Sequence, residues 1–413
     1  MSFGAIADDL TGATDLASRI NRAGRQVVLS FGLPRKKLPP ADAVVVATKS
    51  RMLPPHEACD IALQSARFLS ELGIAQLYFK YCSTFDSTEK GNIGPVIETL
   101  LECTGSALTL ACPSYPAYAR TVYQGHLFVG DRLISESSMR NHPLTPMTDP
   151  DLVRFLGRQC RLPVGLLALK DVDAGAAHVE ALMAQQAAAG RRVLIADAVL
   201  DRHIDTLAEA CGGLGLVTGG APLGGALAAR GPAAMAGKCA IKMERDGPAA
   251  LLSGSCSAMT LVQIGKAVNA IPSRLLDPLR LVEHGKQELA AILDWAIDKS
   301  RNGDFLIYSS ADPQAVNGVQ SCLGREAAGN LLEDAFAEIA AGLAGAGVRK
   351  FVVAGGETSG AVVRALGIQT LAFGEELDPG VPWTYSLDPE GFTLALKSGN
   401  FGGPDFFLRA VAN

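Results

Sequence analysis

Two adjacent carboxylates, Asp8 and Asp9, follow a short apolar run over residues 3–7 and precede a segment over 13–23 whose apolar residues have helical spacing. This pattern predicts a strand, an acidic turn and a helix, and ligands of open α/β sheets bind outside the carboxyl ends of the strands. In the simplest interpretation one aspartate caps the helix and the other is solvated. Two neighbouring carboxylates also repel each other and need partners. We therefore expect one of them to orient or deprotonate a hydroxyl and the other to bind a cation or substrate hydroxyls.

Three basic residues, Lys49, Arg51 and Lys80, stand at the ends of two further predicted strands, so the same edge of the sheet should carry them. Cations gathered at one edge of an acidic protein favour an anion site, and arginine suits a planar carboxylate. Surface ion pairing with Asp86 or Glu89 is the alternative interpretation. A dense polar cluster follows the Lys80 strand. This cluster consists of Ser83, Thr84, Asp86, Ser87 and Thr88. The cations and the polar cluster together suit a small polyhydroxy acid, with cations for its carboxylate and acceptors for its hydroxyls.

The second half of the chain holds three glycine-rich turns at predicted strand ends, over residues 253–257, 355–359 and 398–402. Glycine lets the backbone approach a ligand closely, and helix N-termini present free N–H groups to phosphate. Three such turns in one domain favour a nucleotide. The common phosphate loop is absent, because five residues separate Gly231 from Gly237 where four are required.

The sequence lacks the motifs of several other enzyme classes. A haloacid-dehalogenase-type phosphatase needs Asp-x-Asp at the strand end, whereas Asp8 and Asp9 are adjacent. No G-x-G-x-x-G follows a strand, which disfavours a nicotinamide-dependent dehydrogenase. No nucleophile elbow of a serine hydrolase is present. The six histidines have no metal-ligand spacing, so we expect no certain metal site.

The elements that must position these residues alternate between strands and helices in units of about 30 residues, which predicts βαβ crossovers and a parallel sheet. Strands are expected over 26–31, 43–47, 76–80, 107–111, 164–169, 192–196, 215–218, 249–252, 304–308, 350–354 and 393–396. Helices are expected from 54 to 73, from about 92, and over 174–189, 201–211, 259–270, 287–299 and 325–346. The irregular stretch from Tyr115 to Pro150 should form loops and a hairpin over the active-site edge.

Length and composition fit two domains. The 413 residues exceed one typical core, and the Gly- and Ala-rich stretch over 230–247 is the best linker candidate. We predict an α/β protein of two domains, 1–235 and 236–413, each a mainly parallel sheet flanked by helices. The active site is expected in an interdomain cleft.

Charge and cysteine usage narrow the partners and the compartment. The net charge of −5 and the lack of a basic cluster argue against nucleic acid. No apolar stretch reaches the ~18 residues of a membrane span, and no signal peptide is expected. The nine scattered cysteines, without C-x-x-C spacing, fit reduced thiols in a cytoplasmic protein. A homodimer is left open.

Five motifs, in order along the whole chain, resemble the signature of the four-carbon acid sugar kinase family. They lie over residues 6–15, 80–88, 253–257, 354–360 and 396–402. Three further stretches, over 90–96, 120–125 and 142–149, look most like the 3-oxo-tetronate kinase branch of that family. One departure is that Tyr118-Ala119 precede Arg120, where the family often has Asn-Gly.

The resemblance implies an N-terminal domain that binds an acid sugar, a C-terminal domain that binds ATP with Mg²⁺, and transfer of the γ-phosphoryl group to O4. The expected catalytic residues are Asp9 and Asp8, with Asp9 the preferred base. The expected substrate-binding residues are Thr11, Lys49, Arg51, Lys80, Ser83, Asp86 and Arg120. The expected nucleotide-binding residues are Ser253, Gly254, Ser255, Ser257, Gly355, Gly356, Glu357, Thr358 and Gly399, with Glu357 a candidate for Mg²⁺.

Three alternatives stay open at this point, and one of them is a phosphatase, which would release phosphate without any ADP. A kinase for D-threonate or D-erythronate would differ in its substrate by a single group at C3. A non-catalytic protein that binds an acid sugar would lack the ATP site. The three glycine-rich turns argue against this alternative.

Overall fold

The structure is a computed structural model that describes residues 1–142, 145–231, 247–309, 324–399 and 401–412. The chain divides into two compact units, Met1–Cys239 and Ala240–Asn413. The predicted boundary at residues 235–236 and most of the predicted linker lie outside the described residues, as do residues 232–238 of the stretch compared with a phosphate loop.

The first unit is built on a parallel sheet in the order β2-β3-β1-β4-β11-β5-β10-β9. Its strands alternate with helices along the chain, as the apolar periodicity predicts. The strands are β1 Phe3–Ala7, β2 Val27–Phe31, β3 Ala43–Ala47, β4 Leu77–Lys80, β5 Thr109–Cys112, β9 Val164–Leu167, β10 Val193–Ala196 and β11 Leu216–Gly219. Because β1 pairs with β3 on one side and β4 on the other, the residues that follow these three strands must meet at one edge.

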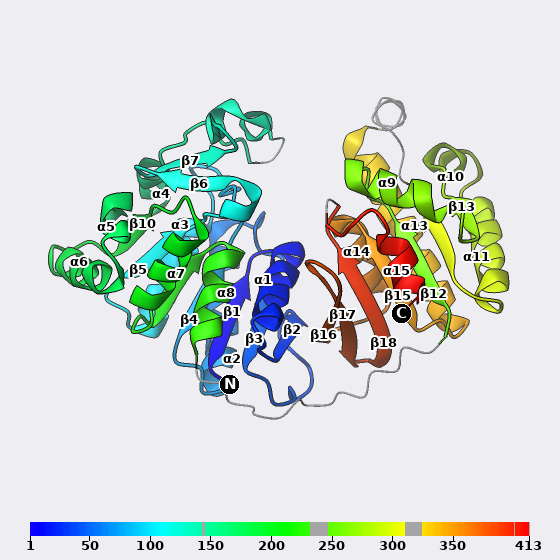
Figure 1. The fold of residues 1–413 in the computed structure, drawn as a ribbon, viewed down its shortest axis with the longest axis horizontal. Helices are drawn as coiled ribbons and strands as arrows, with labels where there is room; N and C mark the ends of the chain where they lie inside the picture. The colour runs from blue at the N-terminus through cyan, green and yellow to red at the C-terminus, as the bar shows by residue number, and fades with distance from the viewer. Residues whose placement is uncertain (143–144, 232–246, 310–323, 400, 413) are drawn as a thin grey trace. The chain divides into compact units, whose positions relative to one another are not determined.

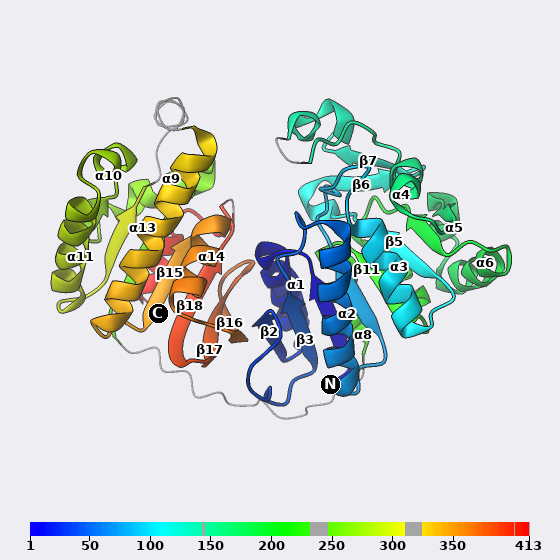
Figure 2. The ribbon, with the colours of Figure 1, turned by 180° about the vertical axis from the view of Figure 1, so that it is seen from behind.

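Helices cover both faces of this sheet. Figure 1 shows α1, α8 and α7 side by side on one face, and Figure 2 shows α2 and α3 on the other. The helices of the first unit are α1 Leu10–Arg22, α2 Pro55–Glu71, α3 Ile93–Thr104, α4 Leu152–Gln159, α5 Leu169–Asp173, α6 Ala176–Ala188, α7 Asp201–Ala210 and α8 Ala221–Arg230. A sheet buried on both faces explains why its strands are apolar runs and not alternating patterns.

The irregular stretch contains the expected hairpin together with one more short strand. The strands β6 Arg120–Tyr123, β7 His126–Val129 and β8 Arg132–Leu133 form an antiparallel sheet. A bridge between Val122 and Ala198 attaches it just beyond the end of β10. The hairpin therefore lies at the carboxyl edge of the main sheet, the edge that carries the acidic pair.

The second unit has a mixed sheet in the order β13-β14-β12-β15-β18-β17-β16, parallel as far as β18 and antiparallel beyond it. Its core lies around Trp383 of β17, which is 1% exposed. The strands are β12 Ala249–Ser253, β13 Ser273–Leu275, β14 Phe305–Tyr308, β15 Lys350–Ala354, β16 Thr370–Asp378, β17 Val381–Asp388 and β18 Glu390–Lys397.

Helices again lie on both faces. Figure 1 shows α9 and α15 on one face of this sheet, and Figure 2 shows α13, α14 and α11 on the other. The helices of the second unit are α9 Ala258–Ala267, α10 Pro278–His284, α11 Lys286–Ser300, α13 Arg325–Gly345, α14 Gly356–Ala365 and α15 Phe406–Ala412. The α/β prediction is confirmed in both units.

Several elements have no counterpart in the sequence-based prediction, namely β13, β16, β17, α4, α5, α8, α10, α14 and α15. Helix α8 shows why such elements are missed. Its glycines lower helix propensity, yet at Gly224 they permit close packing, since a Cβ there would lie 2.7 Å from the Tyr78 ring. Tertiary packing therefore decides this helix. Over the described parts of the chain, no helix has the length and apolar character needed to cross a membrane.

Candidate active site

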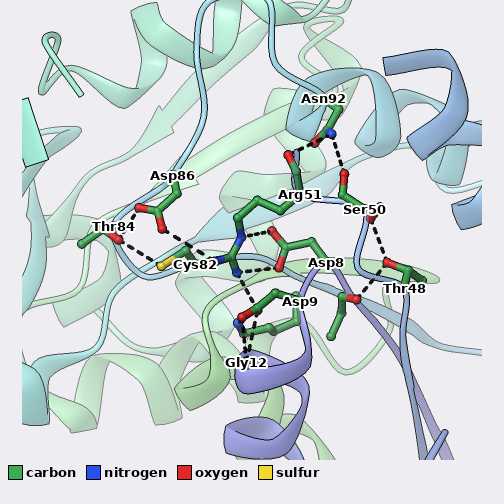
Figure 3. A network of polar contacts seen from close by, with 12 residues as sticks. Asp8, Asp9, Gly12, Thr48, Ser50, Arg51, Cys82, Thr84, Asp86 and Asn92 are labelled. Atoms are coloured by element: carbon green, nitrogen blue, oxygen red, sulfur yellow. Dashed lines mark hydrogen bonds and ion pairs between the residues drawn. The ribbon is translucent and has the colours of Figure 1, made fainter. Parts of the chain in front are cut away.

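The acidic pair lies at the end of β1 and is held by the cations that follow the neighbouring strands (Figure 3). Asp8 is 4% exposed, and its two oxygens accept from Arg51, with Nε–Oδ2 and Nη2–Oδ1 distances of 2.8 Å. The same Nη2 donates to Asp9 Oδ1 at 2.5 Å. Lys80, at the end of β4, brings Nζ within 3.2 Å of Asp9 Oδ1. The predicted edge therefore exists, and its charges already neutralise one another.

Asp9 is also the N-cap of α1. Its carboxylate accepts from the Gly12 amide, at 3.1 Å for Oδ1 and 3.2 Å for Oδ2. The interpretation that one aspartate caps the helix is thus confirmed for Asp9. The expectation that the other aspartate is solvated is wrong, because Asp8 is buried and paired with Arg51. The Asp9 side chain is 25% exposed, whereas that of Asp8 is 5% exposed. Asp9 is therefore the carboxylate that a ligand can reach.

The two aspartates differ in acidity. Burial alone would raise the pKa of Asp9, but Lys80, Arg51 and the Gly12 amide together hold that pKa well below its usual range. For Asp8, burial raises the pKa and outweighs the attraction of Arg51. Asp9 is therefore ionised at neutral pH, a strong hydrogen-bond acceptor and a weak base.

The loop that carries Arg51 is fixed by Asn92. The Asn92 side-chain amide donates to the carbonyl oxygens of Ser50 and Arg51 at 2.9 and 3.2 Å (Figure 3). It also donates to the Leu53 carbonyl at 2.9 Å. The Arg51 amide in turn donates to the Asp8 carbonyl at 3.1 Å. From its position in the sequence, Asn92 is expected only at a helix start, where asparagine is a common cap. The structure shows that its side chain makes no capping hydrogen bond and holds the arginine loop instead.

The remaining predicted substrate residues are distributed around this pair. Asp86 accepts from Thr84 at 2.5 Å, and its Oδ2 lies 3.7 Å from Arg51 Nη1. Ser83 is half-buried beside them, and Thr11 is exposed in the first turn of α1. Lys49 is exposed and has φ of 52°, a left-handed conformation that is uncommon for lysine.

Arg120 does not join the network of described residues around Asp8 and Asp9. Its Nη1 donates to the Tyr118 carbonyl at 2.9 Å. The preceding residue, Ala119, has φ of 53°, so the position where the family often has glycine is left-handed here as well.

A second polar group that sequence analysis missed lies on α1 and the loop after β5. Tyr115 Oη donates to Asp15 Oδ1 at 3.1 Å, and Arg19 Nε donates to Tyr115 Oη at 3.2 Å. The Arg19 guanidinium carbon lies 4.4 Å from the centre of the Tyr115 ring. These residues are 96 to 100 positions apart in sequence, which is why spacing could not associate them.

Gly12 is required for the contact between Lys80 and Asp9. A Cβ at Gly12 would overlap Lys80 Nζ, so we expect Gly12→Ala to displace the ammonium and to lower turnover about 10- to 100-fold by disturbing the position of charged groups. The measurement is steady-state phosphoryl transfer, with a melting curve to show that the protein folds.

The matched control is Gly157→Ala. Gly157 lies in α4, and a Cβ there meets no atom within 4 Å. This variant should keep wild-type turnover and melt slightly higher, since alanine exceeds glycine in helix propensity. Equal turnover in both variants would contradict the role of Gly12.

The three glycine-rich turns of the second unit follow adjacent strands. Because β15 pairs with β12 on one side and β18 on the other, their carboxyl ends bring the turns together. A Cβ at Gly399 would lie 2.7 Å from Ser255 Oγ, and one at Gly254 would overlap Thr358 Oγ1. The structure therefore gathers at one edge all the predicted nucleotide residues, which are Ser253, Gly254, Ser255, Ser257, Gly355, Gly356, Glu357, Thr358 and Gly399.

Two of these turns open directly into helices. Ser257 caps α9, its hydroxyl accepting from the Thr260 amide at 3.3 Å. Gly355, with φ of 123°, precedes α14, which begins at Gly356, so the predicted turn is shorter than residues 355–359. Free N–H groups at a helix N-terminus suit phosphate. Glu357 is exposed in this first turn, and over the described residues no cluster of three metal-ligating side chains occurs.

Comparisons with known proteins match the two parts of the chain to two different domain families. The family model of a sugar-binding N-terminal domain matches residues 3–227, and that of a nucleotide-binding C-terminal domain matches residues 250–407. The chain is 47% identical to the 3-oxo-tetronate kinase of Burkholderia multivorans over 99% of this chain and 96% of that one. It is also 47% identical to the 3-oxo-tetronate kinase of Pseudomonas fluorescens, with the same coverage.

Solved structures share the fold over the full length. A Haemophilus influenzae protein is 41% identical with a TM-score of 0.85, covering 99% of each chain. A Salmonella typhimurium protein described as a tRNA synthase is 39% identical with a TM-score of 0.91, covering 99% of this chain and 98% of that one. With both family models matched in order and relatives of this similarity along its whole length, the chain belongs to the four-carbon acid sugar kinase family and is an ATP-dependent sugar-acid kinase.

Proposed function

We propose that this kinase transfers the γ-phosphoryl group of ATP to O4 of 3-oxo-tetronate and forms 3-oxo-tetronate 4-phosphate. The observation that carries the reaction type is that the chain has both halves of a phosphoryl-transfer site. The first unit has a partly exposed, ionised Asp9 at its sheet edge, and the second unit has three phosphate-type turns that come together at one edge of its own sheet. The choice of acid rests on the relatives at 47% identity, which are named for this substrate.

Asp9 orients the O4 hydroxyl and accepts its proton, with Asp8 the less exposed alternative. Phosphoryl transfer depends mainly on positioning and charge neutralisation, so an acceptor with a low pKa suffices to align the nucleophile. Lys80 and Arg51 bind the substrate carboxylate, and Nη1 is the Arg51 nitrogen that Asp8 and Asp9 leave for it. The substrate hydroxyls and the outer part of the site are assigned to Thr11, Lys49, Ser83, Asp86 and Arg120.

ATP binds at the edge formed by β12, β15 and β18. The backbone at Gly254, Gly355, Gly356 and Gly399 approaches the phosphates, with hydroxyls from Ser253, Ser255, Ser257 and Thr358. Glu357 is a carboxylate beside these turns and fits Mg²⁺, which usually takes one or two carboxylates together with substrate phosphates. When bound, Mg²⁺ neutralises phosphate charge. That the two ligands meet in an interdomain cleft stays a prediction.

The cytoplasm is the proposed compartment, because the described cysteines are free thiols, as in reducing compartments. Sugar acid and ATP are the proposed partners, without nucleic acid or a membrane. The homodimer stays a prediction.

A coupled ADP-release assay over 3-oxo-tetronate, D-threonate and D-erythronate tests the proposal. We expect the largest kcat/KM for 3-oxo-tetronate, since a site built for one substituent at C3 leaves polar groups unpaired with the other. A preference for either hydroxy acid would overturn the substrate. ATP consumption that yields AMP and pyrophosphate, or no nucleotide binding at all, would overturn the reaction type.

A further inference from the structure

Lys397, the last residue of β18, is buried in the second unit, and no carboxylate of the described residues lies beside it. It is 2% exposed. Its ammonium donates to Gly399 O at 2.7 Å, to Thr260 Oγ1 at 2.9 Å and more weakly to Ser398 O at 3.4 Å. All three acceptors are neutral. The ring of Phe406 lies on another side, with its centre 5.7 Å from Nζ.

This lysine joins the three glycine-rich turns. Its own carbonyl accepts from the Gly355 amide at 3.0 Å, which fixes the start of the turn after β15. Its ammonium holds the Gly399 carbonyl in the turn after β18. Through Thr260 it reaches the turn after β12, because Thr260 Oγ1 lies 3.2 Å from Ser255 Oγ and 3.1 Å from Ser257 Oγ.

The Thr260 hydroxyl has both lone pairs occupied when Ser257 and Lys397 donate to it. A hydroxyl offers one proton and two lone pairs. The proton of Thr260 is shared between Gly399 O at 2.8 Å and Ser255 Oγ at 3.2 Å, and its oxygen accepts from Ser257 and Lys397. The arrangement therefore requires a donor at Nζ, which an ammonium supplies and an aliphatic side chain does not.

The positive charge of Lys397 is uncompensated among the described residues. Burial lowers the pKa of Lys397 to about 8, and no neighbouring charge contributes to the shift. Ionisable side chains on the elements packed against it are exposed or paired with each other. On α14 these are the exposed Glu357 and Arg364, on α9 Lys266 with Asp405, and on α15 Arg409 with Asp378. A buried charge of this kind is costly unless a counter-charge arrives.

We propose that Lys397 is a positioning residue of the nucleotide site: its ammonium ties the three turns together, and the phosphates of ATP supply the counter-charge, so that nucleotide binding is coupled to protonation of Lys397. The inference rests on the proposed binding of ATP by this unit. It adds a residue to the predicted set and makes the charge state of Lys397 part of nucleotide affinity.

The coupling has a defined sign. Bound phosphates favour the charged form and raise the pKa of Lys397, so the complex holds more protons than the free protein above pH 8. Binding therefore takes up a proton there, and affinity for ATP falls as pH rises. One pH unit above the free pKa, the loss reaches about tenfold relative to neutral pH.

Calorimetric titration of the full-length protein with Mg-ATP between pH 7.5 and 9.5 tests the inference. The terminal phosphate, with a pKa of about 6, is fully ionised over this range. Two buffers of different ionisation enthalpy report the protons taken up. We expect uptake approaching one proton near pH 9 in the wild type. Lys397→Met should bind at least about tenfold more weakly at pH 7.5 and lose both the pH slope and the proton uptake.

Two further variants separate charge from folding. Lys397→Arg keeps the charge at every pH in the range, so it should show no proton uptake and a flat pH profile. Lys350→Met is the matched control, because Lys350 is also a buried lysine of this unit, on β15 against the Trp383 ring. It should change stability and leave the proton uptake unchanged.

Wild-type binding without proton uptake, or a Lys397→Met protein with wild-type affinity and pH slope, would overturn the inference. If Lys397→Met fails to fold, the wild-type and Lys397→Arg profiles still decide it. A wild-type protein that binds no ATP at pH 7.5, where the lysine is mostly charged, would instead overturn the proposed function, and the inference with it.

Discussion

Asp9→Asn should lower kcat by about 10²- to 10⁴-fold, the usual range for removing a positioned acid–base group. Asparagine keeps an oxygen for the Gly12 amide and is a good N-cap, so α1 should stay folded. What disappears is the negative charge that Lys80 and Arg51 face at 3.2 and 2.5 Å, and with it the proposed acceptor for the O4 proton. Binding of Mg-ATP should be unchanged, because the proposed nucleotide residues all belong to the second unit.

The coupled ADP-release assay measures this effect, with calorimetry for substrate and nucleotide binding and a melting curve for folding. Asp131→Asn is the matched control, since the Asp131 side chain is 96% exposed and lies in the same unit. It should be indistinguishable from wild type. Asp8→Asn answers which aspartate acts: an active Asp9→Asn beside an inactive Asp8→Asn would transfer the role to Asp8, and two active variants would remove the acidic pair from catalysis.

Arg51→Met should cost about 3–5 kcal/mol of stability, the range measured when one partner of a buried ion pair is removed. Asp8 is then left with a buried carboxylate whose two hydrogen bonds from Arg51 are gone. The double variant Asp8→Asn/Arg51→Met removes the unpaired charge and should recover most of the loss. Chemical denaturation monitored by circular dichroism gives the free energies of unfolding.

The pH dependence of this loss provides an independent check. Without Arg51, the pKa of Asp8, already raised by burial, rises further. A group whose pKa is higher in the folded than in the unfolded protein destabilises the fold as pH rises above the unfolded value, so the deficit of Arg51→Met should shrink as pH falls.

Arg132→Met is the control, because Arg132 and Asp131 form an exposed pair whose loss should change stability by less than about 0.5 kcal/mol. An Arg51→Met protein as stable as this control at neutral pH would show that the Asp8 pair contributes nothing.

Much of the candidate site could be predicted because it depends on local pattern. An apolar run followed by Asp8 and Asp9 and a helix-spaced segment is enough to place carboxylates at a strand end. The same reasoning places Arg51, Lys80 and the turns at Gly254, Gly355 and Gly399 at strand ends. Parallel strands with helical crossovers end at one edge of their sheet, so within each unit the α/β class predicts that the residues after its strands lie at the same edge.

The elements that escaped prediction lack a clear local signal. Helix α8 contains glycines that are favourable only because another element packs closely against them, and α14 begins at Gly356, inside a segment typical of a turn. The strands β16 and β17 come after the parallel strands β12 to β15 in the chain, and they pair antiparallel with each other. Antiparallel pairing of β16 with β17 and of β17 with β18 joins them to the sheet of the second unit.

By itself, the amino-acid sequence determined the fold class, the division into a sugar-acid half and a nucleotide half, and the residue types at each edge. Tertiary structure alone decided which charges meet. That Arg51 donates two hydrogen bonds to Asp8 follows from β1 lying between β3 and β4. That Lys397 is buried without a counter-ion among the described residues follows from the packing of Thr260 and Phe406 over the end of β18. The physical reason is that strand order and burial are set by contacts between distant segments, whereas periodicity and motifs report only on neighbours along the chain.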